Sequence, residues 1–481
     1  GSTNMVDAMY THVDGREWEL FADQAWSNQD IERYMGGVSL THTLGSQTFY
    51  EVRLNRMDTY YYAYKGPFRD SSIVQTIGSY PVTEAPEGFS WEFAERTPSD
   101  MPLGAYWSSA EDSSWAKRWD GSFEITSQVN RLNELKAGVD FIYTQQKRNN
   151  RQTTLGSPYL NHDWRRNTSQ GAAFVQNKLE FEGLIANVGL RFDYFKPLGE
   201  WYEYAIYDTS FAATADGTPL DQLLQQEPID GQAALSPRLG VSFPITTNSK
   251  LFFNYGHFRE MLEPNNIFRI DRIGSVGSIG NPAHPMPKTV AYELGYEHNI
   301  FNQFLFRVTG YYKDLSEQPR GVSFVSDDGN VSYSTSLPYN YEDVRGVELS
   351  LNRVTGNVRG WINYTYMAHK FGNYGYGTYY ESPIERADYV QDYRNRVATP
   401  VPQPFARMNL SFIVPQEFGP ELGGTYPLED WRISFLGSWR AGDVITWCGG
   451  GGACPGGISN NMSWKDEWDL DARVSKVFDT S

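Results

Sequence analysis

Apolar and polar residues alternate along most of the chain with the two-residue period of a β-strand whose faces meet different surroundings. In the clearest run, at 184–195, every second residue is apolar: Ala186, Val188, Leu190, Phe192 and Tyr194. The residues between them are polar or small: Asn187, Gly189, Arg191 and Asp193. The same alternation recurs at 135–143, 304–313, 347–352 and 431–440. The pattern predicts a sheet with one apolar face and one wet face.

The predicted strands number about sixteen and run roughly 10 to 15 residues, near the length that a tilted strand needs to cross a bilayer. Short turns are expected at 45–46, 129–132, 183, 246–249, 299–302 and 355–357. Long polar connections are expected at 65–114, 148–170, 196–235, 262–288, 315–341 and 371–403. Short and long connections alternate, which predicts an antiparallel transmembrane β-barrel, because successive hairpins open to opposite sides of the membrane.

A sheet in lipid must also close. Lipid offers no hydrogen-bond partner, so each unpaired backbone group at an open edge would cost several kcal/mol. We therefore expect the barrel to close within this chain or with segments outside it. Composition agrees with a barrel, since 15% of residues are aromatic, with 32 Tyr, 27 Phe and 14 Trp. No apolar run approaches the about 20 residues of a membrane helix.

Charge and motifs exclude several function classes. The formal net charge of -17 argues against a nucleic-acid partner, because phosphate binding draws on clustered Lys and Arg. The seven histidines are scattered, and the sequence has no metalloprotease, nucleophile-elbow or phosphate-loop motif. We expect no enzyme activity, no catalytic residue and no bound cofactor.

Several segments resemble the barrel of TonB-dependent receptors, in particular the Oar-like class that carries a carboxypeptidase-regulatory-like domain ahead of its plug. They are 236–246 (SPRLGVSFPIT), 251–258 (LFFNYGHF), 279–282 (IGNP), 287–297 (PKTVAYELGYE), 311–314 (YYKD), 345–350 (RGVELS) and 469–478 (DLDARVSKVF). Each segment is weak alone, and their order and spacing make the resemblance specific. Lys288 stands where the family usually has an acidic residue.

The resemblance implies a barrel of about twenty-two strands around an N-terminal plug, in the outer membrane of a Gram-negative bacterium with its loops outside. It also implies outer-membrane lipid and an inner-membrane TonB complex as partners. We interpret residues 1–481 as one barrel domain that is incomplete at both ends, with the plug and the last strands outside this chain.

Two loop features have alternative readings. Cys448 and Cys454 bracket a glycine-rich run in a predicted extracellular loop, and a disulfide is expected there because the compartment is oxidising. A lone cysteine pair lacks the other ligands of a zinc site. Asp327, Asp328 and Asn330 form a turn-like run that offers oxygen ligands for Ca²⁺, and a hairpin tip explains the same residues without an ion.

Two tyrosine groups are candidate aromatic contacts. The first lies at the end of one strand and is interpreted as an interfacial girdle: Tyr60, Tyr61, Tyr62 and Tyr64. The second lies in a loop, where stacking on ligand competes with ordinary loop packing: Tyr374, Tyr376, Tyr379 and Tyr380.

Charged residues on the wet face are candidates for lining a solute path or for holding a plug. They are Arg191, Asp193, Arg307, Lys313, Arg359 and Arg440.

Three functions compete at this stage. The leading hypothesis is a plugged, TonB-driven importer whose ligand the sequence does not specify. The second is a passive porin of about sixteen strands, which requires an open channel and paired first and last strands. The third is a surface structural or protein-handling barrel with an associated subunit, such as a surface lipoprotein, over its loops.

Overall fold

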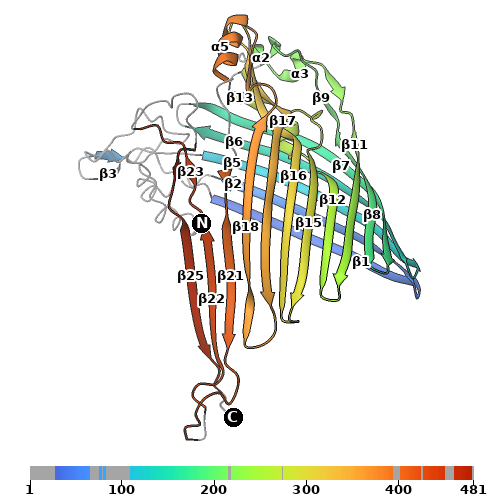
Figure 1. Ribbon diagram of the computed structural model, residues 1–481. Coiled ribbons are helices and arrows are strands. Elements are labelled where there is room, and N and C mark those ends of the chain that lie inside the picture. Colours follow the sequence, from blue (N-terminus) through green and yellow to red (C-terminus); the bar gives the residue numbers. More distant parts are fainter. Residues whose placement is uncertain are drawn as a thin grey trace.

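The computed structural model describes residues 28–64, 75–77, 80–82, 109–154, 157–214, 218–273, 275–393, 401–423, 426–449 and 460–478. Fifteen long strands follow one another as an antiparallel meander (Figure 1). The first eight are β1 (Asn28–Gly45), β2 (Thr48–Tyr64), β5 (Ser109–Asn130), β6 (Asn133–Thr154), β7 (Ser157–Phe181), β8 (Leu184–Leu198), β11 (Gln232–Thr246) and β12 (Ser249–Arg259). The other seven are β15 (Lys288–Ile300), β16 (Phe304–Val325), β17 (Ser332–Arg353), β18 (Val358–Asn373), β21 (Phe405–Ile413), β22 (Trp431–Arg440) and β25 (Glu467–Lys476).

Each long strand pairs with its neighbours in sequence order, so the meander forms one continuous sheet. Four short strands join it and bring it to nineteen: β13 (Ile270–Ile273), β14 (Ser275–Ile279), β19 (Thr378–Tyr380) and β20 (Val401–Pro402). The sheet curls so that β1 to β8 lie behind β12 to β18 (Figure 1). Within the described ranges, β1 pairs only with β2 and β25 only with β22. The expected antiparallel β-barrel sheet is confirmed.

Cross-strand rows explain the alternation in the sequence. Val188, Leu239, Tyr255, Tyr292 and Tyr312 face one another in register across β8, β11, β12, β15 and β16. Within the isolated chain the side chains of Val188, Tyr292 and Tyr312 are exposed, and those of Leu239 and Tyr255 are half-buried. In the membrane, lipid hydrocarbon covers these side chains. Hydrocarbon offers no hydrogen-bond partner, so polar side chains are unfavourable at these positions.

The predicted short turns are confirmed. At 182–183, for example, a two-residue turn joins β7 to β8, and Gly183 adopts the left-handed conformation (φ 82°) that such a turn favours. Two predicted long loops are wrong. Residues 148–170 and 315–341 form mostly strand. Strand β6 continues to Thr154 and β7 starts at Ser157, while β16 and β17 continue to a tip at 326–331. The β16–β17 hairpin extends beyond the lipid because Val322, Phe324 and Tyr333 are buried in a core formed with the neighbouring loops.

The long connections carry the remaining short elements. These are β3 (Gln75–Ile77), β4 (Tyr80–Val82), β9 (Glu200–Tyr202), α2 (Ser210–Ala213), α3 (Leu220–Leu223), β10 (Gln226–Pro228), α4 (Pro264–Phe268), α5 (Pro383–Tyr393), β23 (Val444–Ile445) and β24 (Met462–Ser463). In the part of the chain that the structure describes, no helix is both long and apolar enough to cross a bilayer.

A compact hydrophobic core lies at the long-loop end of the sheet. We call this assembly the loop canopy and define it as residues 199–214, 218–231, 260–273, 275–287 and 322–337, with β19 packed beside them. Its buried core also takes in Phe195 at the end of β8: Phe195, Trp201, Phe211, Leu220, Ile229, Leu262, Ile267, Phe268, Val276, Ile279, Met286, Val322, Phe324, Val331 and Tyr333. Strand β14 pairs in parallel with β17, and β19 with β16, so loop segments extend the hairpin above the wall.

Candidate functional site: the polar inner wall and the loop canopy

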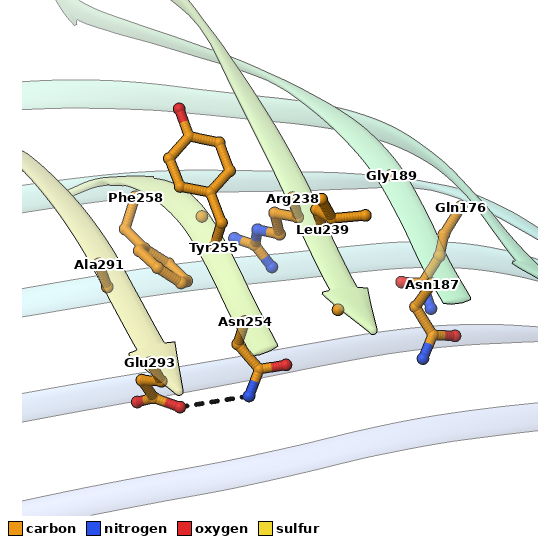
Figure 2. Close-up of a pocket in the computed structure, with 12 residues that line it drawn as sticks. Gln176, Asn187, Gly189, Arg238, Leu239, Asn254, Tyr255, Phe258, Ala291 and Glu293 are labelled. Atoms are coloured by element: carbon orange, nitrogen blue, oxygen red, sulfur yellow. Dashed lines mark hydrogen bonds between the residues drawn. The ribbon is translucent and has the colours of Figure 1, made fainter. Parts of the chain in front are cut away.

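The wet face of the sheet holds a row of polar side chains. Asn187, Gly240, Asn254 and Glu293 are cross-strand partners on β8, β11, β12 and β15. The Asn254 amide donates a hydrogen bond to the Glu293 carboxylate at 3.3 Å (Figure 2). The row therefore offers amide and carboxylate groups to any polar solute that passes along this wall.

The next row forms a shallow hollow of about 360 Å³ beside these groups (Figure 2). Gly189, Arg238 and Gly256 are partners in this row, and the Phe258 ring packs over Gly256, where a Cβ would lie 3.2 Å from it. The guanidinium of Arg238 lies 4.8 Å from the ring centre of Phe258, which fixes the cation at the edge of the hollow. A cation, a carboxylate and an aromatic ring thus line one concavity.

A second hollow of about 430 Å³ continues along the same wall and shares Asn187, Asn254 and Glu293 with the first. It adds Lys250 and Arg307. The wall here is lined by charges of both signs and by amides. It can exchange hydrogen bonds with water or a polar solute.

An ion-pair network supports this part of the wall. The Glu297 carboxylate accepts from Lys250 at 2.9 Å and also pairs with Arg307. Among the described residues, no group of three or more His, Cys, Asp or Glu side chains is arranged to hold a metal ion.

The predicted wet-face charges lie at several separate places. Arg191 pairs with Asp193 at 2.7 Å and with Asp140 at 3.2 Å, and Asp193 is buried beneath the canopy side of the wall. Arg307 joins Glu297 in the network above, while the Lys313 ammonium lies 5.5 Å from the Tyr311 ring centre.

The last two predicted charges lie far from this wall segment. Arg359 donates to the Gly356 carbonyl at 2.8 Å in the β17–β18 turn, and Arg440 pairs with Glu467 at 2.8 Å between β22 and β25. Only Arg307 of the six lines the two hollows. The alternation shows which residues face inward, but not which of them meet across strands. The register between neighbouring strands, obtained by aligning their apolar positions, could have shown that Asn187, Asn254 and Glu293 lie side by side.

Above the wall, the segment 280–287 is held by side chains from other elements. Trp201 donates from its indole nitrogen to the Gly280 carbonyl at 3.1 Å. Gln232 donates to the His284 carbonyl at 2.6 Å and accepts from the Met286 amide at 3.0 Å. Since His284 and Met286 are buried, these bonds satisfy backbone groups that water does not reach.

The aromatic core fixes the hairpin tip of β16 and β17. Phe324 stacks between Tyr333 and Tyr379, with ring centres 5.4 and 5.6 Å away. The Tyr333 hydroxyl donates to the Ile206 carbonyl at 2.7 Å, and burial raises the pKa of this phenol. The canopy is consequently a packed unit and not a set of independent loops.

The four candidate loop tyrosines occupy different surroundings. Tyr379 packs on the canopy, and Tyr376 lies edge-on to it, with ring centres 5.9 Å apart. Tyr380 contacts Tyr389 of α5 at 5.7 Å, and Tyr374 contacts Tyr341 at 4.8 Å while remaining largely exposed. Tyr374 is the one of the four that presents most of its ring to the outside.

The strand tyrosines divide between the two faces. Tyr60 and Tyr62 share the outer face with Leu54, and Tyr61 points to the opposite side. The side chain of Tyr64 lies outside the described residues. An outward tyrosine at this end of β2 is placed as an interfacial girdle requires.

The acidic run forms the tip of the β16–β17 hairpin. Both carboxylate oxygens of Asp328 accept hydrogen bonds from Asn330, and one also accepts from Ser326 at 2.6 Å. These bonds lower the pKa of Asp328. The Asp327 amide donates to Glu381 at 3.0 Å. Hydrogen bonds within the tip therefore already engage both oxygens of Asp328.

Cys448 is disulfide-bonded, and Cys454 lies outside the described residues. The pairing of these two cysteines stays a prediction.

Comparison with known proteins agrees with this architecture. The family model described as TonB dependent receptor-like, beta-barrel matches residues 4–476. A search of curated proteins finds no significant match.

Solved structures share the fold. The ferric yersiniabactin uptake receptor FyuA from Yersinia pestis superposes with a TM-score of 0.56 at 11% identity, covering 94% of this chain and 54% of that chain. The outer membrane transporter YddB from Escherichia coli gives 0.57 at 11%, with 94% and 57% covered. The copper transporter OprC gives 0.51 at 13%, with 94% and 59% covered. This chain thus spans somewhat more than half the length of these transporters.

The two-faced meander, the sorting of turns and long loops to opposite ends, and the match over nearly the whole sequence agree with one another. The chain belongs to the family of TonB-dependent receptor β-barrels, which are receptors and transporters of the Gram-negative outer membrane and work with TonB in the inner membrane.

Proposed function

We propose that this chain is the barrel of a TonB-driven importer, whose loop canopy captures a ligand and whose inner wall carries it inward past a plug. The row of Asn187, Asn254 and Glu293 carries this proposal. A continuous polar wall on the concave side suits a path for a polar cargo. The related structures named for uptake of ferric yersiniabactin or transport of copper support the class of activity.

Single-channel conductance of the full-length protein in a planar bilayer tests the proposal. A plugged importer is expected to be electrically silent and to conduct only while urea unfolds the plug. Cross-linking in intact cells is the second measurement, and an importer is expected to cross-link to TonB. Steady conductance without urea, together with no cross-link to TonB, would instead establish a passive porin.

A further inference from the structure

One connection at the short-turn end of the sheet is much longer than the others. Six connections there, such as 182–183 and 354–357, have two to four residues, whereas residues 414–430, between β21 and β22, number seventeen. The Ile413 amide donates to the Asn357 carbonyl at 2.7 Å, which places this connection beside the β17–β18 turn. In Figure 1 it is the loop below β21 and β22. We call residues 414–430 the periplasmic loop, because the short turns of outer-membrane barrels face the periplasm.

Hydrogen bonds fix the shape of the periplasmic loop. The Glu429 carboxylate accepts from the Glu417 amide at 2.8 Å, which ties the start of the loop to its end. The Pro427 carbonyl accepts from the Trp431 indole at 3.0 Å and from the Lys476 ammonium at 2.5 Å, which ties the end of the loop to β22 and β25. A partner would therefore meet a preorganised surface, and less conformational entropy would be lost on binding.

Three apolar side chains of the periplasmic loop are exposed. The exposed fractions of Phe418, Leu422 and Leu428 are 51, 62 and 49%. The Leu428 side chain covers Gly419, where a Cβ would lie 3.0 Å from it, so Leu428 lies beside the backbone that carries Phe418. We call Phe418, Leu422 and Leu428 the apolar face of the loop.

Lipid does not cover this apolar face. Trp431 and Lys476 are cross-strand partners on the outer face of β22 and β25, and the Lys476 ammonium lies 5.4 Å from the Trp431 ring centre. An aromatic ring and a lysine at the end of a membrane-spanning strand mark the membrane interface. The periplasmic loop lies beyond these two residues, on the water side. A group of apolar side chains exposed to water indicates a protein-binding surface.

The periplasmic loop also carries unbalanced negative charge. Its charged residues are all acidic: Glu417, Glu421, Glu429 and Asp430. Over 414–423 and 426–430, the parts of the loop that the structure describes, none of these carboxylates forms an ion pair.

The nearest cations do not neutralise these carboxylates. Arg353, Arg359 and Lys476 donate instead to backbone carbonyl groups at the strand ends. Arg432 lies on the inner face of β22. Because Glu417 and Glu421 are exposed, a partner that binds the loop is expected to bring its own cations.

We propose that the periplasmic loop is a docking surface for a basic segment of TonB. TonB is the inner-membrane partner of this family and reaches the barrel from the periplasmic side. The apolar face packs against apolar side chains of that segment, and Glu417 and Glu421 pair with its lysine or arginine side chains. This inference rests on the proposed TonB-driven import and adds a contact that the barrel itself makes.

The test measures the affinity of the periplasmic part of TonB, from the same bacterium, for the full-length protein in nanodiscs by biolayer interferometry. The variant F418S/L422S is expected to weaken binding about tenfold, because two apolar anchors are lost. The control F301S/L132S replaces the same residue types, also exposed, at two other short turns and should bind as wild type.

Ionic strength separates the contribution of charge. The variant E417Q/E421Q is expected to weaken binding about threefold at low salt and to match the wild type at about 1 M salt, because salt screens exposed charges. The control E134Q/E182Q removes two carboxylates near the short turns of β6 to β8 and should bind as wild type at both salt concentrations. Heat-modifiable gel mobility checks that each variant is folded.

A cross-link in intact cells is an independent measurement. Benzoylphenylalanine in place of Leu422 should cross-link to TonB on irradiation, and the same group in place of Phe301 should not. Equal affinity of the wild type, F418S/L422S and E417Q/E421Q for TonB would overturn this inference and leave the proposed import intact. No binding of TonB to the wild type would overturn both. If F418S/L422S instead converts a dimer of the full-length protein to monomers and keeps its affinity for TonB, the loop is an interface between copies and the inference is wrong.

Discussion

The transmembrane wall and the loop canopy contain the same apolar residue types, but these side chains are covered by lipid in the wall and by protein in the canopy. On the wall, side chains such as Leu190 and Phe192 remain exposed within the chain, because lipid completes their burial. In the canopy, Phe268 and Leu220 are completely buried by protein. The wall is therefore stabilised by its solvent and by strand pairing, whereas the canopy is stabilised by a core like that of a soluble domain.

Removing a core ring from the canopy should give the largest effect. Phe268 contacts Trp164 and Trp201 at ring-centre distances of 5.7 and 5.9 Å. Phe268→Ala leaves a cavity and is expected to cost the canopy about 3–5 kcal/mol of local stability. Hydrogen exchange of 260–287 would measure the loss. The control Phe192→Ala, on the lipid face, should leave exchange in the canopy unchanged, and equal exchange in the two variants would contradict the comparison.

Placing a charge on the lipid face should give the next largest effect. Leu190→Arg is expected to cost about 2–4 kcal/mol, because the guanidinium would lie in hydrocarbon. Urea-dependent folding into vesicles measures this cost. Ser242→Arg places the same side chain on the wet inner wall and should cost far less. If both variants lose the same stability, the assignment of the two faces is incorrect.

The wall could be predicted because its signal is local. Alternation in 184–195 is visible within one strand, and it identified the faces of Leu190 and Arg191 without knowledge of any partner. The row that joins Asn187, Asn254 and Glu293 depends on register between separate strands, which local alternation does not specify.

The canopy could not be predicted for a related reason. Phe211, Leu220 and Phe268 occur in segments without period, and each segment alone looks like a polar connection. Their contacts join residues far apart in the chain, such as Tyr207 with Phe324 and Trp201 with Phe268. These segments come together only in the folded sheet, whose strands place the loops side by side.

The canopy should depend on buried side-chain hydrogen bonds, whereas the outer face of the wall should not. Gln232→Ala removes three hydrogen bonds to 280–287, including a 3.5 Å donation to the Pro282 carbonyl, and leaves the His284 carbonyl and the Met286 amide without the Gln232 side chain. The expected cost is about 1–3 kcal/mol of canopy stability. Limited proteolysis of 260–287 measures it, and Gln232→Glu, which keeps an acceptor for Met286 but no donor, should fall between wild type and Gln232→Ala. Unchanged proteolysis in both variants would show that these bonds do not hold the segment.

The smallest expected effect is a pH dependence confined to the canopy, because a single proton is involved. His284 is fully buried, and its Nδ1 hydrogen donates to the Pro285 carbonyl at 2.7 Å, since a carbonyl can only accept. Burial lowers the pKa of His284 below its ordinary value of 6.5, and the backbone carbonyls and the Glu317 carboxylate oppose this shift only in part. The unfolded segment therefore binds the proton more readily than the folded one, so canopy stability is complete above pH 6.5 and declines as the pH falls below it. Hydrogen exchange of 280–287 should accelerate over this range relative to that of β15 and β16, and His284→Asn should remove the slope. If the hydrogen exchange of His284→Asn had the same pH dependence as wild type, the dependence would belong to other groups. The canopy would then not differ from the wall in its response to acid through His284.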